Sequence, residues 1–433
     1  MSATLQSADP LPTVRTTAAA GARAALILLL LINLLNYIDR QILAAVEKPI
    51  GDEYGVSAAA TGWLASAFMI SYMVFSPLFG VLADRMRRWA IVGVGVLLWS
   101  LASGGSGAAP VFSALVMMRL AIGIGEAAYG PVAPTIISDL YPLAIRGNVL
   151  SWFYAAIPVG SALGYVIGGL FHAHWHWAFY VTLPPGLLLG AWCFFMPEPK
   201  REGIAARRRP TRADYAQLVK IPSYVIGCAG MAAMTFAIGG IGFFMPRYLV
   251  EVANLDPAKS TPIFGGIVVI AGLLATLAGG IAGDKLRARF PGSYFLVSAA
   301  GMLVGFPLSI LMLFTPFPLC WVVIFCAVFC LFFNTGPSNT IIANVTPPTV
   351  RATAFAVNIF VIHLLGDTIS PPIIGFVSKH GGGLRAGFAV VSVMMLIGGL
   401  LWLWGARYLD RDTRAASGAP PGAFPVITPV PGH

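Results

Sequence analysis

Five ionisable side chains fall inside strongly apolar stretches of the sequence: Asp39, Arg40, Arg119, Glu126 and Asp367. A charge near the centre of a membrane is costly, so residues of this kind are functional candidates by default. Carboxylates in such surroundings can exchange protons when their hydration or their neighbours change. Arginines can bind anionic groups through charge-assisted hydrogen bonds. The chemistry that these residue types predict is therefore proton exchange and anion binding.

The helical period gathers the charged residues of each stretch on one face. At about 100° per residue, Asn36, Asp39 and Arg40 share one arc of the first helix. Arg119 and Glu126 are seven residues apart and share a face of the fourth predicted helix. Both signs occur on both helices, so the charges can pair and stay near neutral. We interpret Asp39 and Glu126 as proton-coupling carboxylates. The alternative is a structural ion-pair cluster that only fixes helix packing.

A second set of polar residues lies nearer the C-terminus, and its members are more loosely grouped along their helix. His363 and Asp367 are four residues apart, a spacing at which helical side chains can hydrogen-bond. The predicted seventh and eighth spans carry no charge near their middles. A cavity between the two halves would then be polar on one wall and apolar on the other, which favours an amphiphile over a sugar. The predicted substrate-binding residues are Asn36, Arg40, Arg119, Asn358, His363 and Asp367.

The elements that position these residues are predicted from composition. The chain has 433 residues, of which 58% are hydrophobic and only 10% are charged, whereas soluble domains carry about 25% charged residues. Runs of about 20 apolar residues cross a bilayer as helices. The sequence therefore predicts an all-α polytopic membrane protein with twelve spans, at residues 25–48, 58–82, 89–108, 112–136, 148–171, 177–196, 223–246, 262–283, 292–314, 318–343, 352–377 and 385–406.

The net charge of +10 reflects orientation in the membrane rather than nucleic-acid binding. Of 27 Lys and Arg residues, those expected on the far side of the membrane are Lys48, Arg247, Lys259, Lys379 and Arg385. Arg40 and Arg119 lie within spans, and the rest fall on the side of both termini. This asymmetry follows the positive-inside rule. It predicts a multi-pass protein of the cell inner membrane with both termini cytoplasmic and no nucleic-acid partner.

The spans divide into two sets of six. The predicted parts are a cytoplasmic tail (1–23), an N-terminal six-helix bundle (24–197), a basic linker (198–221), a C-terminal six-helix bundle (222–407) and a disordered cytoplasmic tail (408–433). The linker ends in ADYAQLVKI, for which a short helix on the membrane surface and a solvated linker are both open. The two sets of six predict two pseudo-symmetric bundles around a central cavity.

A short motif occurs twice, six spans apart. GVLADRMRR follows the second span, and GGIAGDKLRAR follows the eighth. The first copy resembles the signature of the major facilitator superfamily between its second and third helices, although Arg87 stands where that family usually has glycine. The resemblance implies the major facilitator fold. It also implies a cytoplasmic gate, in which the aspartate caps a neighbouring helix and holds an arginine. The gate residues that it implies are Gly80, Asp84, Arg85, Arg88 and Asp284.

Two further stretches are similar to the Spinster branch of that superfamily. They are NYIDRQ, residues 36–41, and GIGEAAYGPVAPTIISDLYPLAIRG, residues 123–147. The resemblance covers most of residues 30–410. It implies proton-linked secondary transport of lysophospholipids or phosphorylated sphingoid bases by alternating access. The first-helix motif is also similar to that of organic anion symporters, so an organic anion:proton symporter or a multidrug exporter remains the alternative.

Other classes of protein are not indicated. The sequence shows no nucleophile–base pair, phosphate loop or metal cluster, so neither an enzyme nor a cofactor is expected. The five cysteines fall within spans without metal-ligand spacing to histidine. A receptor would normally add a sizeable domain outside the membrane. The expected partners are an amphiphilic or lipid substrate, protons and the bilayer.

The gate motif generates a first prediction. Asp84→Asn should lower the transport rate and change apparent substrate affinity only modestly, because the change shifts the balance between conformations rather than removing a substrate contact. Reaction rates of cysteine probes placed at the cytoplasmic side would measure that shift. Unchanged probe rates in the variant would contradict the gate role.

Overall fold

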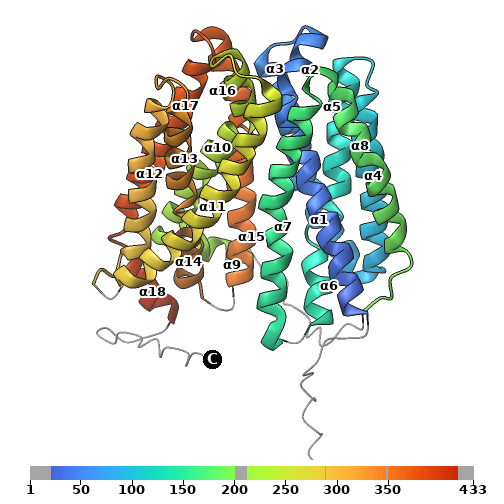
Figure 1. The fold of residues 1–433 in the computed structure, drawn as a ribbon. Helices are drawn as coiled ribbons and strands as arrows, with labels where there is room; N and C mark the ends of the chain where they lie inside the picture. Colours follow the sequence, from blue (N-terminus) through green and yellow to red (C-terminus); the bar gives the residue numbers. More distant parts are fainter. Residues whose placement is uncertain (1–20, 142, 200–211, 288, 348–349, 418–433) are drawn as a thin grey trace, which may run out of the picture.

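The computed structural model describes residues 21–417 except 142, 200–211, 288 and 348–349, and the described elements are all helical. Two helical bundles stand side by side, the first blue to green and the second yellow to red (Figure 1). The first bundle consists of α1 Ala22–Ala45, α2 Glu47–Tyr54, α3 Ala58–Arg85, α4 Arg88–Gly107, α5 Phe112–Ala127, α6 Ala133–Leu140, α7 Leu143–Leu170, η1 His172–His174 and α8 Trp175–Cys193.

The second bundle is reached through α9 Arg212–Val219. It consists of α10 Pro222–Glu251, α11 Pro257–Arg287, α12 Ser293–Leu311, α13 Cys320–Phe332, α14 Thr335–Val345, α15 Arg351–Ile362, η2 His363–Asp367, α16 Ser370–His380, α17 Leu384–Gly405 and α18 Leu409–Ser417. Ten of the described helical stretches are long and apolar enough to cross a membrane. The α5–α6 pair and α8 occupy the remaining two places, in agreement with the twelve predicted spans.

Three predicted spans are interrupted rather than continuous. The fourth breaks between α5 and α6 around Gly130 and Pro131, and the tenth breaks between α13 and α14. The eleventh passes through η2, a π-helical turn in which Gly366 has non-helical dihedral angles. Proline lacks a backbone donor and glycine relaxes the backbone, so these residue types favour a break at Gly130, Pro131 and Gly366. Turns of the π type are frequent at functional sites.

Small residues set the close packing of the first bundle. A side chain added at Gly160 or Gly164 would strike a backbone carbonyl of α1, because the Cβ positions lie 2.6 Å from Leu34 O and 2.5 Å from Ile38 O. Gly168 follows one turn later and contacts α1 at Ala45. Helices approach this closely only where one presents glycine. This contact holds α7 firmly against α1, the helix that carries the charged residues.

The two bundles meet tightly at one end of the molecule. The start of α1 and the helix α18 lie at the other end, which we call the terminal end; the end that carries α2 is the opposite end (Figure 1). Near the opposite end, a side chain at Gly62 of α3 would lie 2.7 Å from the Pro371 carbonyl of α16, and one at Gly375 would lie 2.5 Å from Ala58 O. Tyr165 of α7 donates a hydrogen bond to Gly242 O of α10 at 2.6 Å. These contacts close the bundle there.

The segments outside the bundles differ in part from expectation. Part of the linker forms the helix α9, while residues 200–211 lie outside the described residues. The prediction of disorder from residue 408 is wrong for Leu409–Ser417, which form α18. Asp412 of α18 is buried and accepts a hydrogen bond from the backbone N–H of Ser223 at 2.9 Å. Its carboxylate therefore caps the N-terminus of α10, a function that fixes this helix to the bundle.

This cap provides a test of what α18 contributes. Asp412→Ala should lower the free energy of unfolding by about 1 kcal/mol, because the first turn of α10 loses its side-chain acceptor. Thermal unfolding of the purified protein in detergent would measure the change. Asp410→Ala on the same helix is the matched control: this residue pairs with Arg414 and is partly exposed, so a smaller effect is expected. Equal losses in the two variants would contradict the capping role.

Candidate functional site

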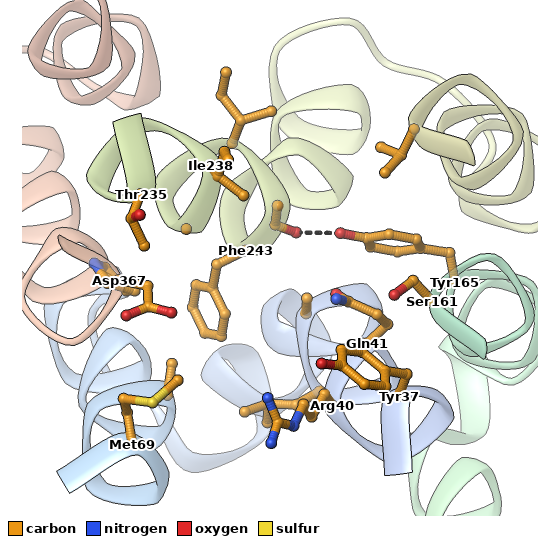
Figure 2. A pocket seen from close by; sticks show the side chains of 18 of the residues that line it. Tyr37, Arg40, Gln41, Met69, Ser161, Tyr165, Thr235, Ile238, Phe243 and Asp367 are labelled. Carbon is orange, nitrogen blue, oxygen red and sulfur yellow. Dashed lines mark hydrogen bonds between the residues drawn. The ribbon is translucent and has the colours of Figure 1, made fainter. Parts of the chain in front are cut away.

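A cavity of about 430 Å³ lies between the two bundles, below their closed end. In the first bundle it is lined from α1, α3, α5 and α7, and in the second from α10, α11, α13, α15, η2 and α16. Figure 2 shows Arg40 and Tyr37 on one side of this space and Asp367, Phe243 and Ile238 on the other. Residues more than 300 positions apart in the sequence therefore line the same cavity.

Arg40 forms the central ion pair of the site. Its Nε and Nη2 atoms lie 2.8 and 2.7 Å from Oε2 of Glu126. Glu126 is fully buried, whereas Arg40 retains 20% of its side-chain exposure and lines the cavity. Breaking a buried pair leaves an uncompensated charge and is strongly destabilising. The ion pair is therefore stable where water is excluded, but an anion in the cavity can compete with Glu126 for the Arg40 guanidinium.

Arg119 lies beside this pair with hydrogen-bonding capacity to spare. Its side chain is only 2% exposed and lines the same cavity. Its Nε and Nη1 have no hydrogen-bond acceptor among the described residues. A buried guanidinium normally has all its donors satisfied. Arg119 is therefore poised to bind an anionic group that enters the cavity.

Aromatic rings surround the two arginines. The Phe68 ring lies 4.8 Å from Cζ of Arg40 and 5.3 Å from Cζ of Arg119. Tyr37 and Tyr72 lie 5.1 and 5.3 Å from the Arg40 guanidinium. A ring between two cations stabilises both through its quadrupole and keeps them apart. These rings were not predicted from the sequence, although Phe68 and Tyr72 are four residues apart in one predicted span.

The two carboxylates do not face the cavity directly. Among the described residues the lining includes Arg40 and Arg119 but neither Asp39 nor Glu126. Asp39 is 1% exposed and accepts a hydrogen bond from Ser103 of α4 at 3.2 Å, while its Oδ2 has no described donor. Both carboxylates are buried inside the bundle rather than on its lipid-facing surface. The arginines separate them from the ligand space.

The remaining predicted binding residues divide into two groups. His363 and Asp367 line the cavity, and their Nδ1 and Oδ2 atoms lie 3.0 Å apart, which confirms the expected contact. Asn36 is buried beside Glu126, and Asn358 is buried with its Nδ2 atom 3.6 Å from Met231 Sδ. Neither asparagine lines the cavity. The two asparagines can therefore position other side chains but do not contact a ligand in this conformation.

The second bundle supplies an apolar wall around that His–Asp pair. This wall consists of Ile238, Ile241, Phe243, Phe264, Val268, Val328, Leu331, Phe332 and Ile362. The predicted contrast between a polar wall and an apolar wall is therefore present, with His363 and Asp367 as a polar point on the apolar side. Such a cavity matches a ligand that has an anionic group at one end and an apolar body at the other.

The predicted gate residues lie at the terminal end, away from this cavity. Arg88 is buried and forms ion pairs with Asp139 of α6 at 2.6 Å and with Glu198 at 2.9 Å. Arg85 is exposed at the end of α3, and Gly80 has open space at its Cβ position. Asp284 accepts a hydrogen bond from Tyr294 at 2.8 Å. The side chain of Asp84 lies outside the described residues, so its predicted role as a cap stays a prediction.

Comparisons with known proteins agree with this architecture. The family model of the Major Facilitator Superfamily matches residues 29–366. The sphingosine-1-phosphate transporter SPNS2 of Mus musculus is 37% identical over 373 residues, which cover 80% of this chain and 68% of the mouse protein. Protein spinster homolog 3 of Danio rerio is 34% identical over 455 residues, covering 96% of this chain and 91% of that protein.

Solved structures with low sequence identity share the fold. A bacterial homologue of the human lysosomal transporter Spinster, in an inward-facing and unoccupied conformation, has a TM-score of 0.78 at 21% identity and covers 93% of this chain and 99% of its own. A D-xylose–proton symporter has a TM-score of 0.69 at 18% identity, with coverage of 87% and 96%. At these identities the likeness shows a shared fold.

The aromatic ring between the arginines leads to a prediction about binding. Phe68→Leu keeps an apolar side chain but removes the ring, so the guanidinium groups lose their cation–π contacts. The affinity for dodecyl phosphate, an anionic single-chain amphiphile, should fall about two- to tenfold. Isothermal titration in a non-ionic detergent would measure it. Met69→Leu, at the next residue in the same lining, should leave the affinity within about twofold. Equal affinities in the wild type and in Phe68→Leu would contradict this role.

Proposed function

The chain belongs to the Spinster branch of the major facilitator superfamily and is a membrane transporter rather than an enzyme, and we propose that it carries lipid-like amphiphiles in exchange or symport with protons. The substrate class is a single-chain molecule with an anionic headgroup, of the lysophospholipid or sphingoid-phosphate type. Transport proceeds by alternating access of the central cavity to the two sides of the membrane. The mouse relative is named a sphingosine-1-phosphate transporter, which supports this class.

The observation that supports this substrate class is that one wall of the cavity is cationic and the other is apolar. Arg40 and Arg119 present guanidinium groups from the first bundle, and the second bundle faces them with aromatic and aliphatic side chains. A phosphate headgroup can accept several hydrogen bonds from two arginines at once. The acyl or alkyl chain gains free energy when it leaves water for the apolar wall, about 0.8 kcal/mol per CH₂ group. Neither wall alone accounts for both ends of such a molecule.

Charge balance supports proton coupling at the same site. Two carboxylates, Asp39 and Glu126, accompany two guanidinium groups, so the ionised cluster is neutral overall. An anionic headgroup that binds the arginines adds a negative charge to a buried, poorly hydrated region. A net charge in such a region is costly, and proton uptake by one of the carboxylates removes it. Because the groups interact, the proton belongs to the pair rather than to a single residue.

In this structure the cavity is closed on the side of the opposite end. The bundles are packed together at the opposite end, so the substrate reaches the cavity from the terminal end. With the charge asymmetry of the sequence, we place the termini and the basic linker in the cytoplasm and the protein in the cell inner membrane. The opposite end then faces out of the cell. Alternating access requires that its contacts separate and the terminal end close.

Proteoliposome uptake tests the coupling. Asp39→Asn and Glu126→Gln should each abolish the response of lysolipid transport to an imposed pH gradient, since neither variant residue can take up a proton. Transport is measured with and without the gradient for a lysophospholipid, a sphingoid phosphate and small organic anions. Full gradient-driven transport by the double variant would remove proton coupling and leave the cluster as a structural ion-pair network. Preference for small organic anions would favour the alternative substrate class.

The arginines should determine the affinity for the headgroup. Arg40→Ala and Arg119→Ala should each weaken binding of anionic amphiphiles about tenfold or more, because each removes charge-assisted hydrogen bonds to the headgroup. Binding of an uncharged amphiphile with the same chain, such as a monoacylglycerol, serves as the comparison and should change less. Parallel losses for the charged and the uncharged ligand would show that the variants damage the cavity as a whole.

A further inference from the structure

Asp367 places a carboxylate on the apolar side of the cavity, where neither a phosphate group nor an alkyl chain would pair with it. It lies in η2 of the second bundle, and its side chain keeps 22% of its exposure. Among the described residues that line the cavity it is the only acidic one. Arg40 and Arg119 line the cavity from the first bundle, so Asp367 presents the opposite charge from the facing side (Figure 2).

The charge of Asp367 has one neighbour that could balance it. Its Oδ1 and Oδ2 atoms lie 3.1 and 3.0 Å from Nδ1 of His363, its only ion-pair partner among the described residues. A neutral histidine donates a hydrogen bond through Nδ1 but leaves the negative charge in place. Arg40 is paired with Glu126 instead. Because a carboxylate beside an apolar wall is costly without a cation, this position favours a ligand that brings a positive charge.

The backbone fixes the carboxylate at the edge of the cavity. Gly366 precedes Asp367 and has non-helical dihedral angles within the π-helical turn. On α10, a side chain added at Gly239 would lie 2.7 Å from Cβ of Asp367, so the close approach of these two helices needs glycine there. The carbonyl of Thr368 accepts a hydrogen bond from the hydroxyl of Ser66 in α3. Three elements therefore hold the carboxylate in place, as a binding group requires.

One short stretch of α3 relates this carboxylate to the arginines. Ser66 contacts the carbonyl of Thr368, the residue that follows the carboxylate. Phe68 lies against the guanidinium groups of Arg40 and Arg119. Ser66 and Phe68 are two residues apart, a rise of about 3 Å along a helix. The acidic group and the cationic groups therefore border the cavity at a similar level along α3, from the two bundles.

We propose that Asp367 binds an ammonium group of the transported amphiphile, so that the headgroup recognised by this cavity is zwitterionic. The phosphate lies at Arg40 and Arg119, and an ammonium group joined to it by a short linker donates hydrogen bonds to the Asp367 carboxylate. His363 donates to the same carboxylate and orients it. This inference rests on the proposed function, because it needs the phosphate site that the arginines form.

The charge of this subsite would select among phospholipids in two ways. An ammonium group forms charge-assisted hydrogen bonds with a carboxylate, which are roughly twice as strong as bonds between neutral groups. A headgroup without a cation would bring its negative charge into a poorly hydrated space that already holds the Asp367 carboxylate, and like charges repel there. Asp367 therefore attracts zwitterionic headgroups and disfavours purely anionic ones, which is how a binding site gains specificity.

Two lysophospholipids with the same acyl chain test the subsite. Lysophosphatidylethanolamine and lysophosphatidylglycerol both carry a phosphodiester with a single negative charge, but only the first has an ammonium group. In titrations of the purified protein in a non-ionic detergent, the wild type should bind the ethanolamine lipid about tenfold more tightly. Asp367→Asn keeps the shape of the side chain but removes its charge, and it should reduce this preference to less than about twofold.

Two further variants separate the subsite from general effects. Asp52→Asn is the matched control, because it removes a carboxylate that lies on α2 and does not line the cavity. It should keep the full preference for the ethanolamine lipid. Arg119→Ala should weaken the binding of both lipids by a similar factor, because it acts on the phosphate that they share.

Equal affinities of the wild type for the two lipids would overturn the subsite, and this measurement does not depend on the folding of any variant. Equal affinities are the result expected if a protonated His363 balances Asp367 by itself. A preference that persists undiminished in Asp367→Asn would overturn it as well. Both results leave the proposed transport of amphiphiles intact. Failure of the wild type to bind either lipid would instead refute the proposed substrate class, and the subsite with it.

Discussion

The ion pair between Arg40 and Glu126 is the interaction on which the functional site depends. It places a fully buried carboxylate against a guanidinium that still reaches the cavity. Desolvation of both groups is tolerable only because the remaining charges and rings are arranged around them. Phe68 separates the two arginines, and Ser103 holds Asp39 on the far side of the cluster. The close approach of α7 to α1 at Gly160 then prevents the charged helix from shifting.

Much of this site follows from the sequence because its members share helical faces. Local periodicity predicts that Asp39 and Arg40 point inward together, and the same holds for Arg119 and Glu126. The cost of charge in an apolar span identifies them as functional candidates. Hydropathy likewise predicts the spans and the two-bundle fold. The contact between His363 and Asp367 is expected from their spacing of four residues, although the segment between them forms a π-helical turn rather than a regular α-helix.

The remaining features depend on contacts between distant segments. Nothing local to Glu47 distinguishes it from a solvated residue at a span end, since Lys48 and Asp52 stand beside it. Its partner Arg247 is 200 positions away, and only the packing of α2 against α10 brings them together. The same applies to Asp412, which looks like part of a polar tail until α18 folds back on α10. The breaks at Gly130 and Gly366 depend on the tertiary fold as well, because glycine alone does not end a helix.

Two ion pairs of the α1–α2 segment, Arg40–Glu126 and Glu47–Arg247, differ in how they respond to motion between the bundles. Arg40 and Glu47 are seven residues apart, with only Val46 between their helices. Arg40 pairs with a residue of its own bundle, so the charged cluster moves as one body when the bundles rock. Glu47 pairs with the other bundle, so its contact must break in the same motion. Conformational change therefore alters the cluster mainly through what faces it: the apolar wall, water or a headgroup. Under the proposed proton coupling, a change of hydration at an otherwise intact cluster would alter which carboxylate holds a proton, since hydration favours the charged form and desolvation the neutral one.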